Sequence, residues 1–145
     1  MIKLLQSLVF IMLASIVFQA NAADDKPFAE TKVVLQISDA DPTKQTLVLN
    51  VASNVVKAYG QDKVDVEIVA FGPGLRLMFD DNHNKDRISG LSDSGVRFAA
   101  CSNTMKKMTQ QLGETPKLNS NATEVPAGVV RIIELVNEGY ILIKP

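Results

Sequence analysis

The chain has 145 residues, 46% of them hydrophobic, with 15 basic and 16 acidic residues that give a formal net charge of −1. This length suits one globular domain rather than two. The balanced charge excludes the strong positive field by which a protein attracts nucleic acid or an anionic membrane, so we expect neither partner.

The first 22 residues have the pattern of a secretory signal peptide. Lys3 supplies a positive charge, an apolar run follows over residues 8–18, and Ala20-Asn21-Ala22 offers small residues where a signal peptidase cleaves. A permanent membrane anchor is the competing interpretation, but the run is shorter than the roughly 20 apolar residues that a span needs. We therefore expect cleavage after Ala22, a single domain over residues 23–145, a periplasmic location and no membrane attachment after cleavage.

The first half of this domain alternates between apolar runs and a helical pattern. Residues 32–37 form a short β-branched run that is typical of a buried strand. Asp41-Pro42 then predicts a helix start, because Asp can cap free amides and Pro suits the first turn, and Gly60 predicts its end. Residues 63–71 predict a second strand, which Gly72-Pro73-Gly74 interrupts.

The second half continues the alternation. In chain order we expect one or two helical pieces between residues 75 and 92, a strand from Gly95 to Cys101, a helix over 102–112, a short strand at 124–125, a helix starting at 126–128 and a last strand over 140–144. In the last helix, four aliphatic residues fall on one side: Val129, Ile132, Ile133 and Val136.

This order of elements predicts an α/β fold with a mostly parallel sheet covered on both faces. The nearly continuous apolar strands agree, because parallel strands are buried on two sides. In such sheets, ligands and reactive groups gather beyond the carboxyl ends of the strands. Four segments should meet there: "SDADP", "GPGLRL", "CSNT" and "VPAG".

Cys101 is the single cysteine of the chain and falls at this edge. A thiol at the first turn of a helix faces unpaired amides, which stabilise its thiolate and lower its pKa. Ser102, Asn103 and Thr104 could add hydrogen bonds. On this interpretation the side chain is partly open to water. The alternative is a buried cysteine that packs at the end of a strand, and the residues alone leave both open.

Other candidate groups are weaker. Gly72, Pro73 and Gly74 form either a tight turn or a loop whose amides bind an anion near Cys101. His83, in a strongly polar stretch, is interpreted as a solvated surface residue. No metal-site spacing and no nucleotide-binding glycine loop are present in the sequence, so we expect neither a metal nor a cofactor.

Four segments, "VVLQISD", "VEIVAFGPGL", "SGVRFAACSNTM" and "VPAGVVRIIELVNEGYILIKP", resemble the DsrE/DsrF-like family in their order and spacing, over residues 32–145. The resemblance implies a three-layer α/β/α domain with a mainly parallel five-stranded sheet, usually in oligomers. It also implies a cysteine that carries sulfur as a persulfide, and the cysteine that matches is Cys101. Two features depart from the family: the export signal, and Phe71 where many relatives have a histidine.

The favoured hypothesis is an exported sulfur-handling protein that holds sulfane sulfur as a persulfide on Cys101 and passes it to a thiol-bearing protein or a small sulfur compound. Ser102 and Asn103 would supply hydrogen bonds, and Gly72, Pro73 and Gly74 would form the opposite wall of the site.

The alternative is a non-enzymatic oligomeric module that binds a small anion or a neighbouring subunit and has a structural cysteine. A thiol redox enzyme is a third hypothesis, weakened because the chain lacks a resolving cysteine. On any of these we expect a homo-oligomer, because a parallel sheet with an exposed edge can bury it against a second copy.

Overall fold

The structure is a computed structural model that describes residues 26–145, and the predicted signal peptide lies outside these residues. Five strands form one sheet in the order β4-β3-β2-β1-β5, and every strand pair is parallel. The elements in chain order are β1 (Thr31–Ile37), α1 (Pro42–Tyr59), β2 (Val64–Ala70), the 3-10 helix η1 (Gly72–Met78), α2 (Lys85–Asp93), β3 (Val96–Cys101), α3 (Ser102–Leu112), β4 (Ala122–Val125), α4 (Gly128–Asn137) and β5 (Ile141–Ile143).

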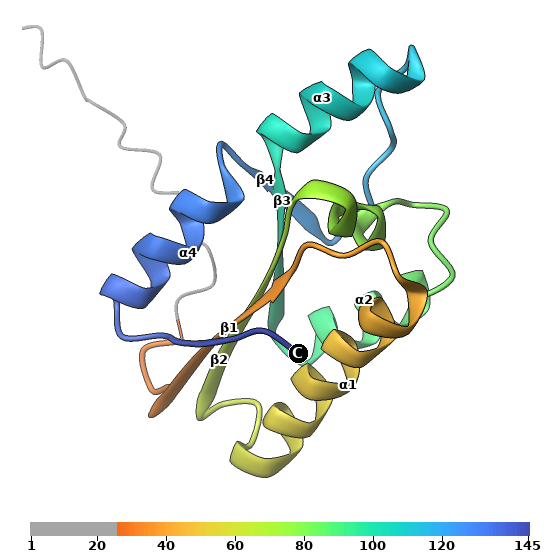
Figure 1. Cartoon of the computed structure of the whole chain (residues 1–145). Helices are drawn as coiled ribbons and strands as arrows, with labels where there is room; N and C mark the ends of the chain where they lie inside the picture. Colours follow the sequence, from red (N-terminus) through yellow and green to blue (C-terminus); the bar gives the residue numbers. More distant parts are fainter. Residues whose placement is uncertain (1–25) are drawn as a thin grey trace, which may run out of the picture.

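Helices cover both faces of the sheet. Figure 1 shows α1 and α2 on one face, α4 on the other, and α3 projecting beyond the end of β3. The side of α1 and α2 holds the larger cluster of buried apolar side chains, and the α4 side holds a smaller one. The predicted three-layer α/β/α fold with its five-stranded sheet is therefore confirmed.

Local signals in the sequence place α1 as expected. Asp41 accepts a hydrogen bond of 2.7 Å from the amide of Thr43, and Pro42 occupies the first turn. At the other end, Gly60 has a φ of 87° and donates its amide to the carbonyl of Val56. A side chain is disfavoured at that φ, which is why glycine ends the helix here.

The Gly72-Pro73-Gly74 segment follows the end of β2, as predicted, and it begins η1 rather than forming an isolated turn. Gly72 has a φ of 53°, in the region that favours glycine. At Gly74, an added Cβ would lie 2.5 Å from the carbonyl oxygen of Ile37. Glycine is thus required at Gly74 because η1 packs directly on the backbone that leaves β1.

Helix α4 separates the four aliphatic residues that the sequence places on one side. Ile132 and Leu135 pack on the sheet, whereas Val129, Ile133 and Val136 are 53%, 54% and 43% exposed. A helix with aliphatic residues around most of its circumference carries no signal for which stripe meets the sheet. Val129, Ile133 and Val136 therefore form an exposed apolar stripe on α4. None of the helices in residues 26–145 is long and apolar enough to cross a membrane.

Candidate functional site

Segments that follow three different strands meet at the carboxyl edge of the sheet. Cys101 ends β3 and lies in register with Val125 of β4. The amide of Asn103 donates to the carbonyl of Pro126 over 3.3 Å. The amide of Gly72 donates to the hydroxyl oxygen of Thr104 over 2.9 Å. The parallel topology therefore gathers the glycine segment, the start of α3 and the start of α4 around Cys101.

Cys101 is the N-cap residue of α3 and is only 5% exposed. The expectation that its side chain is partly open to water is therefore wrong. The cover comes from β4, which pairs with the end of β3, and from the turn that leads into α4. A reagent or substrate must reach the sulfur through a narrow approach or after a local opening.

The pKa of the Cys101 thiol is lowered from its ordinary value. Burial alone would raise this pKa, but hydrogen bonding from the Thr104 hydroxyl and from the amides of Gly128, Thr104 and Asn103 more than offsets it. Cys101 is the N-cap residue of α3, but its neutral thiol accepts no capping hydrogen bond from the amides of the helix. We conclude that these donors act chiefly on the charged form, which is how hydrogen bonding lowers an acid's pKa.

Thr104 is oriented by the glycine segment. Its hydroxyl oxygen accepts the amide of Gly72, so its own hydrogen is free to point elsewhere. The Thr104 hydroxyl donates this hydrogen toward the sulfur of Cys101 and lowers the pKa of the thiol. A chain of two hydrogen bonds thus links the start of η1 to the thiolate.

The predicted ligand-binding residues divide into two groups. The backbone amide of Asn103 lies near the sulfur, as expected of the first turn of α3, but it is the weakest of the four donors and also donates to the carbonyl of Pro126 over 3.3 Å. Ser102 does not, because its hydroxyl donates to the Glu124 carboxylate over 2.7 Å. The hydrogen bond that the sequence suggested from the Ser102 side chain is therefore directed to β4 instead.

An open groove of about 500 Å³ lies beside the cysteine, between the start of η1 and α3. Thr104 and Asn103 line it, so the groove reaches the immediate neighbours of Cys101. The full lining is Phe71, Gly72, Pro73, Asn103, Thr104, Lys107, Met108 and Gln111. The amides of the glycine segment are poorly placed to bind an anion, because Gly72 already donates to Thr104 and Gly74 is buried against β1.

The remaining candidates lie elsewhere. His83 is exposed, bonds to the Asn84 side chain over 3.1 Å, and does not line the groove. In the part of the chain that the structure describes, no group of three His, Cys, Asp or Glu side chains could hold a metal ion.

Sequence reasoning missed the contribution of Gly128. The "VPAG" segment was placed at the correct edge, but nothing in it indicated that the first amide of α4 would face the thiol. A Cβ on Gly128 would lie 3.0 Å from the Cβ of Phe71. Phe71, the residue before the glycine segment, therefore packs on the helix start and offers the thiol no polar group.

Comparisons with known proteins agree with this fold. A family model, that of the DsrE/DsrF-like family, matches residues 31–145. The protein of unknown function MTH1491 from Methanobacterium thermoautotrophicum is 28% identical, with a TM-score of 0.72 over 80% of this chain and 100% of that one. The ychN protein from E. coli is 14% identical, with a TM-score of 0.62 over 79% and 99% of the two chains, and it shows the fold alone. The comparison with curated proteins gave no match.

Proposed function

This chain belongs to the DsrE/DsrF-like family, and we propose that it handles sulfane sulfur, carrying it as a persulfide on Cys101. The observation that carries this proposal is the set of donors around the sulfur. Four hydrogen-bonding groups, from the first turns of α3 and α4, lower the pKa of Cys101 despite its burial. The thiolate is the nucleophilic form of cysteine, so the site favours the form that reacts.

The proposed transfer needs no oxidant. The Cys101 thiolate attacks the outer sulfur of a donor persulfide, R–S–SH. A new bond forms between Sγ and that sulfur, the S–S bond of the donor breaks, and the donor leaves as the thiolate R–S⁻ with the bonding electron pair. The hydrogen stays on the transferred sulfur, and the same steps in reverse deliver it to an acceptor thiolate.

A single cysteine is sufficient for this chemistry. Each transfer exchanges one thiolate for another, so no second cysteine is needed to resolve a disulfide. The chain has one cysteine, which suits sulfur transfer better than it suits a thiol redox enzyme.

The approach to Cys101 favours a small donor or acceptor. Cys101 is 5% exposed, and the groove beside it reaches its neighbours Thr104 and Asn103. A short inorganic polysulfide or a cysteine at the tip of a partner's loop fits such an approach better than a broad surface does. We propose the periplasm as the location, supported by the signal-peptide pattern of residues 1–22.

An oligomeric assembly module is the second candidate function, favoured by the exposed stripe of α4. Val129, Ile133 and Val136 follow one another at helical spacing and are each more than 40% exposed. Leu142 of the edge strand β5 adds a further exposed aliphatic side chain. We propose that a second copy of the chain covers this stripe, since two uncharged aliphatic stripes complement each other, and this assembly is compatible with either function.

Mass spectrometry tests the sulfur-carrying function. The protein is incubated with inorganic polysulfide, desalted and digested, and the Cys101 peptide should gain about 32 Da, the mass of one sulfur atom. Cyanide, which removes sulfane sulfur, should reverse the gain, and the Cys101→Ser variant should show none. An unmodified Cys101 peptide under conditions that load a small-molecule thiol would contradict the proposal and favour the assembly module.

A further inference from the structure

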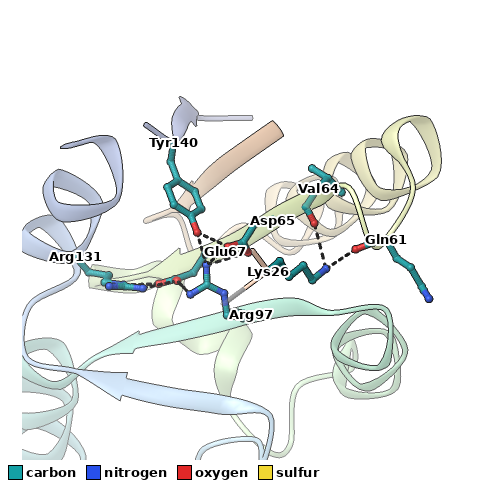
Figure 2. A network of polar contacts seen from close by, with 8 residues as sticks. All are labelled: Lys26, Gln61, Val64, Asp65, Glu67, Arg97, Arg131 and Tyr140. Carbon is teal, nitrogen blue, oxygen red and sulfur yellow. Dashed lines mark hydrogen bonds and ion pairs between the residues drawn. The ribbon is translucent and has the colours of Figure 1, made fainter. Parts of the chain in front are cut away.

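A network of buried charges lies on the face of the sheet that α4 covers (Figure 2). Glu67 of β2 is 2% exposed and accepts two hydrogen bonds of 2.8 Å from the Nε and Nη2 of Arg131 on α4. Arg97 of β3 contacts the same carboxylate over 2.8 Å. A fork of two parallel hydrogen bonds fixes orientation as well as distance, so the Arg131–Glu67 pair holds α4 at a defined position on β2.

A second carboxylate completes the network. Asp65, also 2% exposed, accepts hydrogen bonds from Arg97 and from the hydroxyl of Tyr140. Tyr140 lies beyond the C-terminal end of α4, whereas Arg131 lies in its first turns. The two carboxylates therefore hold opposite ends of the segment that covers this face.

Apolar packing alone defines the position of α4 poorly. Two of its large side chains, Ile132 and Leu135, are buried against the sheet. The hydrophobic effect is non-directional, so a contact this small tolerates sliding and rotation. The ion pair supplies the directional restraint that the apolar contact lacks.

The first turn of α4 transmits this restraint to the cysteine. The amide of Arg131 donates to the carbonyl of Ala127 over 3.0 Å and thereby closes the turn that contains Gly128. No side chain caps this end of the helix. Arg131 is the third residue after Gly128, which corresponds to about one turn of rigid helix. Gly128 also packs closely against the side chain of Phe71, so the start of α4 has little room to move toward Phe71.

We infer that the Arg131–Glu67 ion pair positions the first turn of α4 so that the Gly128 amide faces the sulfur of Cys101. Arg131 and Glu67 are positioning residues, because they touch neither the sulfur nor the groove. The inference rests on the proposed function for its significance, since a poised thiolate matters only if Cys101 reacts. The geometry can nevertheless be tested without any sulfur transfer.

The rival explanation is that the pair only stabilises the fold. Breaking a buried ion pair is destabilising in any case, so a loss of stability does not discriminate. The discriminating measurement is the pH midpoint of Cys101 alkylation by iodoacetamide, which follows the formation of the thiolate. Besides Arg131 and Glu67, the elements around the cysteine carry other charged side chains, and all three variants of Arg131 and Glu67 keep them unchanged: Asp65 on β2, Arg76 on η1, Arg97 on β3, Lys106 and Lys107 on α3, Glu124 on β4 and Glu134 on α4.

Two variants of opposite charge separate positioning from electrostatics. Arg131→Met removes a positive charge, and Glu67→Gln removes a negative one. If the pair positions Gly128, both variants raise the midpoint, because both release the helix start. If the charges act only through space, Glu67→Gln lowers the midpoint while Arg131→Met raises it. We expect the alkylation rate at neutral pH to fall about tenfold to a hundredfold in both, as loss of one hydrogen bond to a charged group predicts.

Tyr140→Phe is the matched control, because it breaks the network at the far end of α4. It should lower the urea midpoint of unfolding and leave the alkylation midpoint unchanged. Should Arg131→Met fail to fold, Arg131→Lys keeps the charge but loses the fork, and it should still raise the alkylation midpoint. Wild-type alkylation midpoints in the folded Arg131 and Glu67 variants, or shifts of opposite sign, would overturn the inference. The alkylation midpoints say nothing of persulfide uptake, which mass spectrometry measures separately. Failure of this inference can therefore be distinguished from failure of the proposed function.

Discussion

Thr104 offers the sharpest test of the donor arrangement around Cys101. Thr104→Val replaces the hydroxyl by a methyl group of nearly the same size. The change removes the donor to the sulfur and leaves the amide of Gly72 without its 2.9 Å acceptor. The groove walls stay close to their original shape, so steric access to the cysteine changes little.

The expected size of the effect follows from these two lost interactions. The unpaired, partly buried Gly72 amide should reduce the free energy of unfolding by about 1–3 kcal/mol. The thiolate loses a neutral hydroxyl donor, so the pKa of Cys101 should rise toward its ordinary value. Thr104→Ser keeps the hydroxyl and should retain the low pKa.

Iodoacetamide labelling across a pH series reports the pKa, and urea unfolding reports stability. Thr104→Val should shift the labelling midpoint upward and the urea midpoint downward, while Thr104→Ser stays near the wild type in labelling. A labelling midpoint in Thr104→Val equal to that of the wild type would refute the view that Thr104 donates to the sulfur.

Three further outcomes can be checked in parallel. Cys101→Ser should abolish persulfide uptake and lose a pH-dependent part of the stability. Because the thiol pKa is lowered from 9.0, the wild type should gain stability over the variant as the pH rises from the folded pKa to 9.0, and the gain should level off above it, as measured by urea unfolding at several pH values. Gly74→Ala should cost about 1–3 kcal/mol because its Cβ would lie 2.5 Å from a backbone carbonyl of β1, whereas Gly90→Ala, within α2 and with open space around it, should be neutral or stabilising in the same assay. Ile133→Lys should lower the mass found by light scattering if a second copy covers α4, while Leu112→Lys, equally exposed at the end of α3, should not.

Local patterns were sufficient to predict the strand and helix order. Asp41 and Gly60 mark the ends of α1 because capping depends on residues adjacent in sequence. The placement of Cys101 at the carboxyl edge was equally accessible, since it follows from the parallel topology rather than from side-chain detail.

Contacts between distant segments were not accessible in the same way. The Ser102 hydroxyl donates to Glu124, and the Gly128 amide donates toward the sulfur of Cys101. In both pairs the two residues are more than 20 positions apart in the sequence, and no periodicity in the sequence encodes such a contact. The burial of Cys101 has the same origin, because its cover comes from β4 and the turn before α4. The burial of Ile132 without Val129, Ile133 and Val136 could not be predicted, because α4 is aliphatic on both sides and the charges that join it to β2, on Glu67 and Arg131, lie far apart in the sequence.

The burial of Cys101 changes what labelling rates can show. A structural cysteine and a functional but covered one both react slowly, so a slow absolute rate at 5% exposure does not separate them. The donors do separate them. A purely structural thiol in an apolar site has a raised pKa, because burial disfavours the charged form. Around Cys101 the opposite holds, and the donors that cause it are a neutral hydroxyl and backbone amides. The pH midpoint, rather than the rate, is therefore the quantity that decides between a structural and a reactive Cys101.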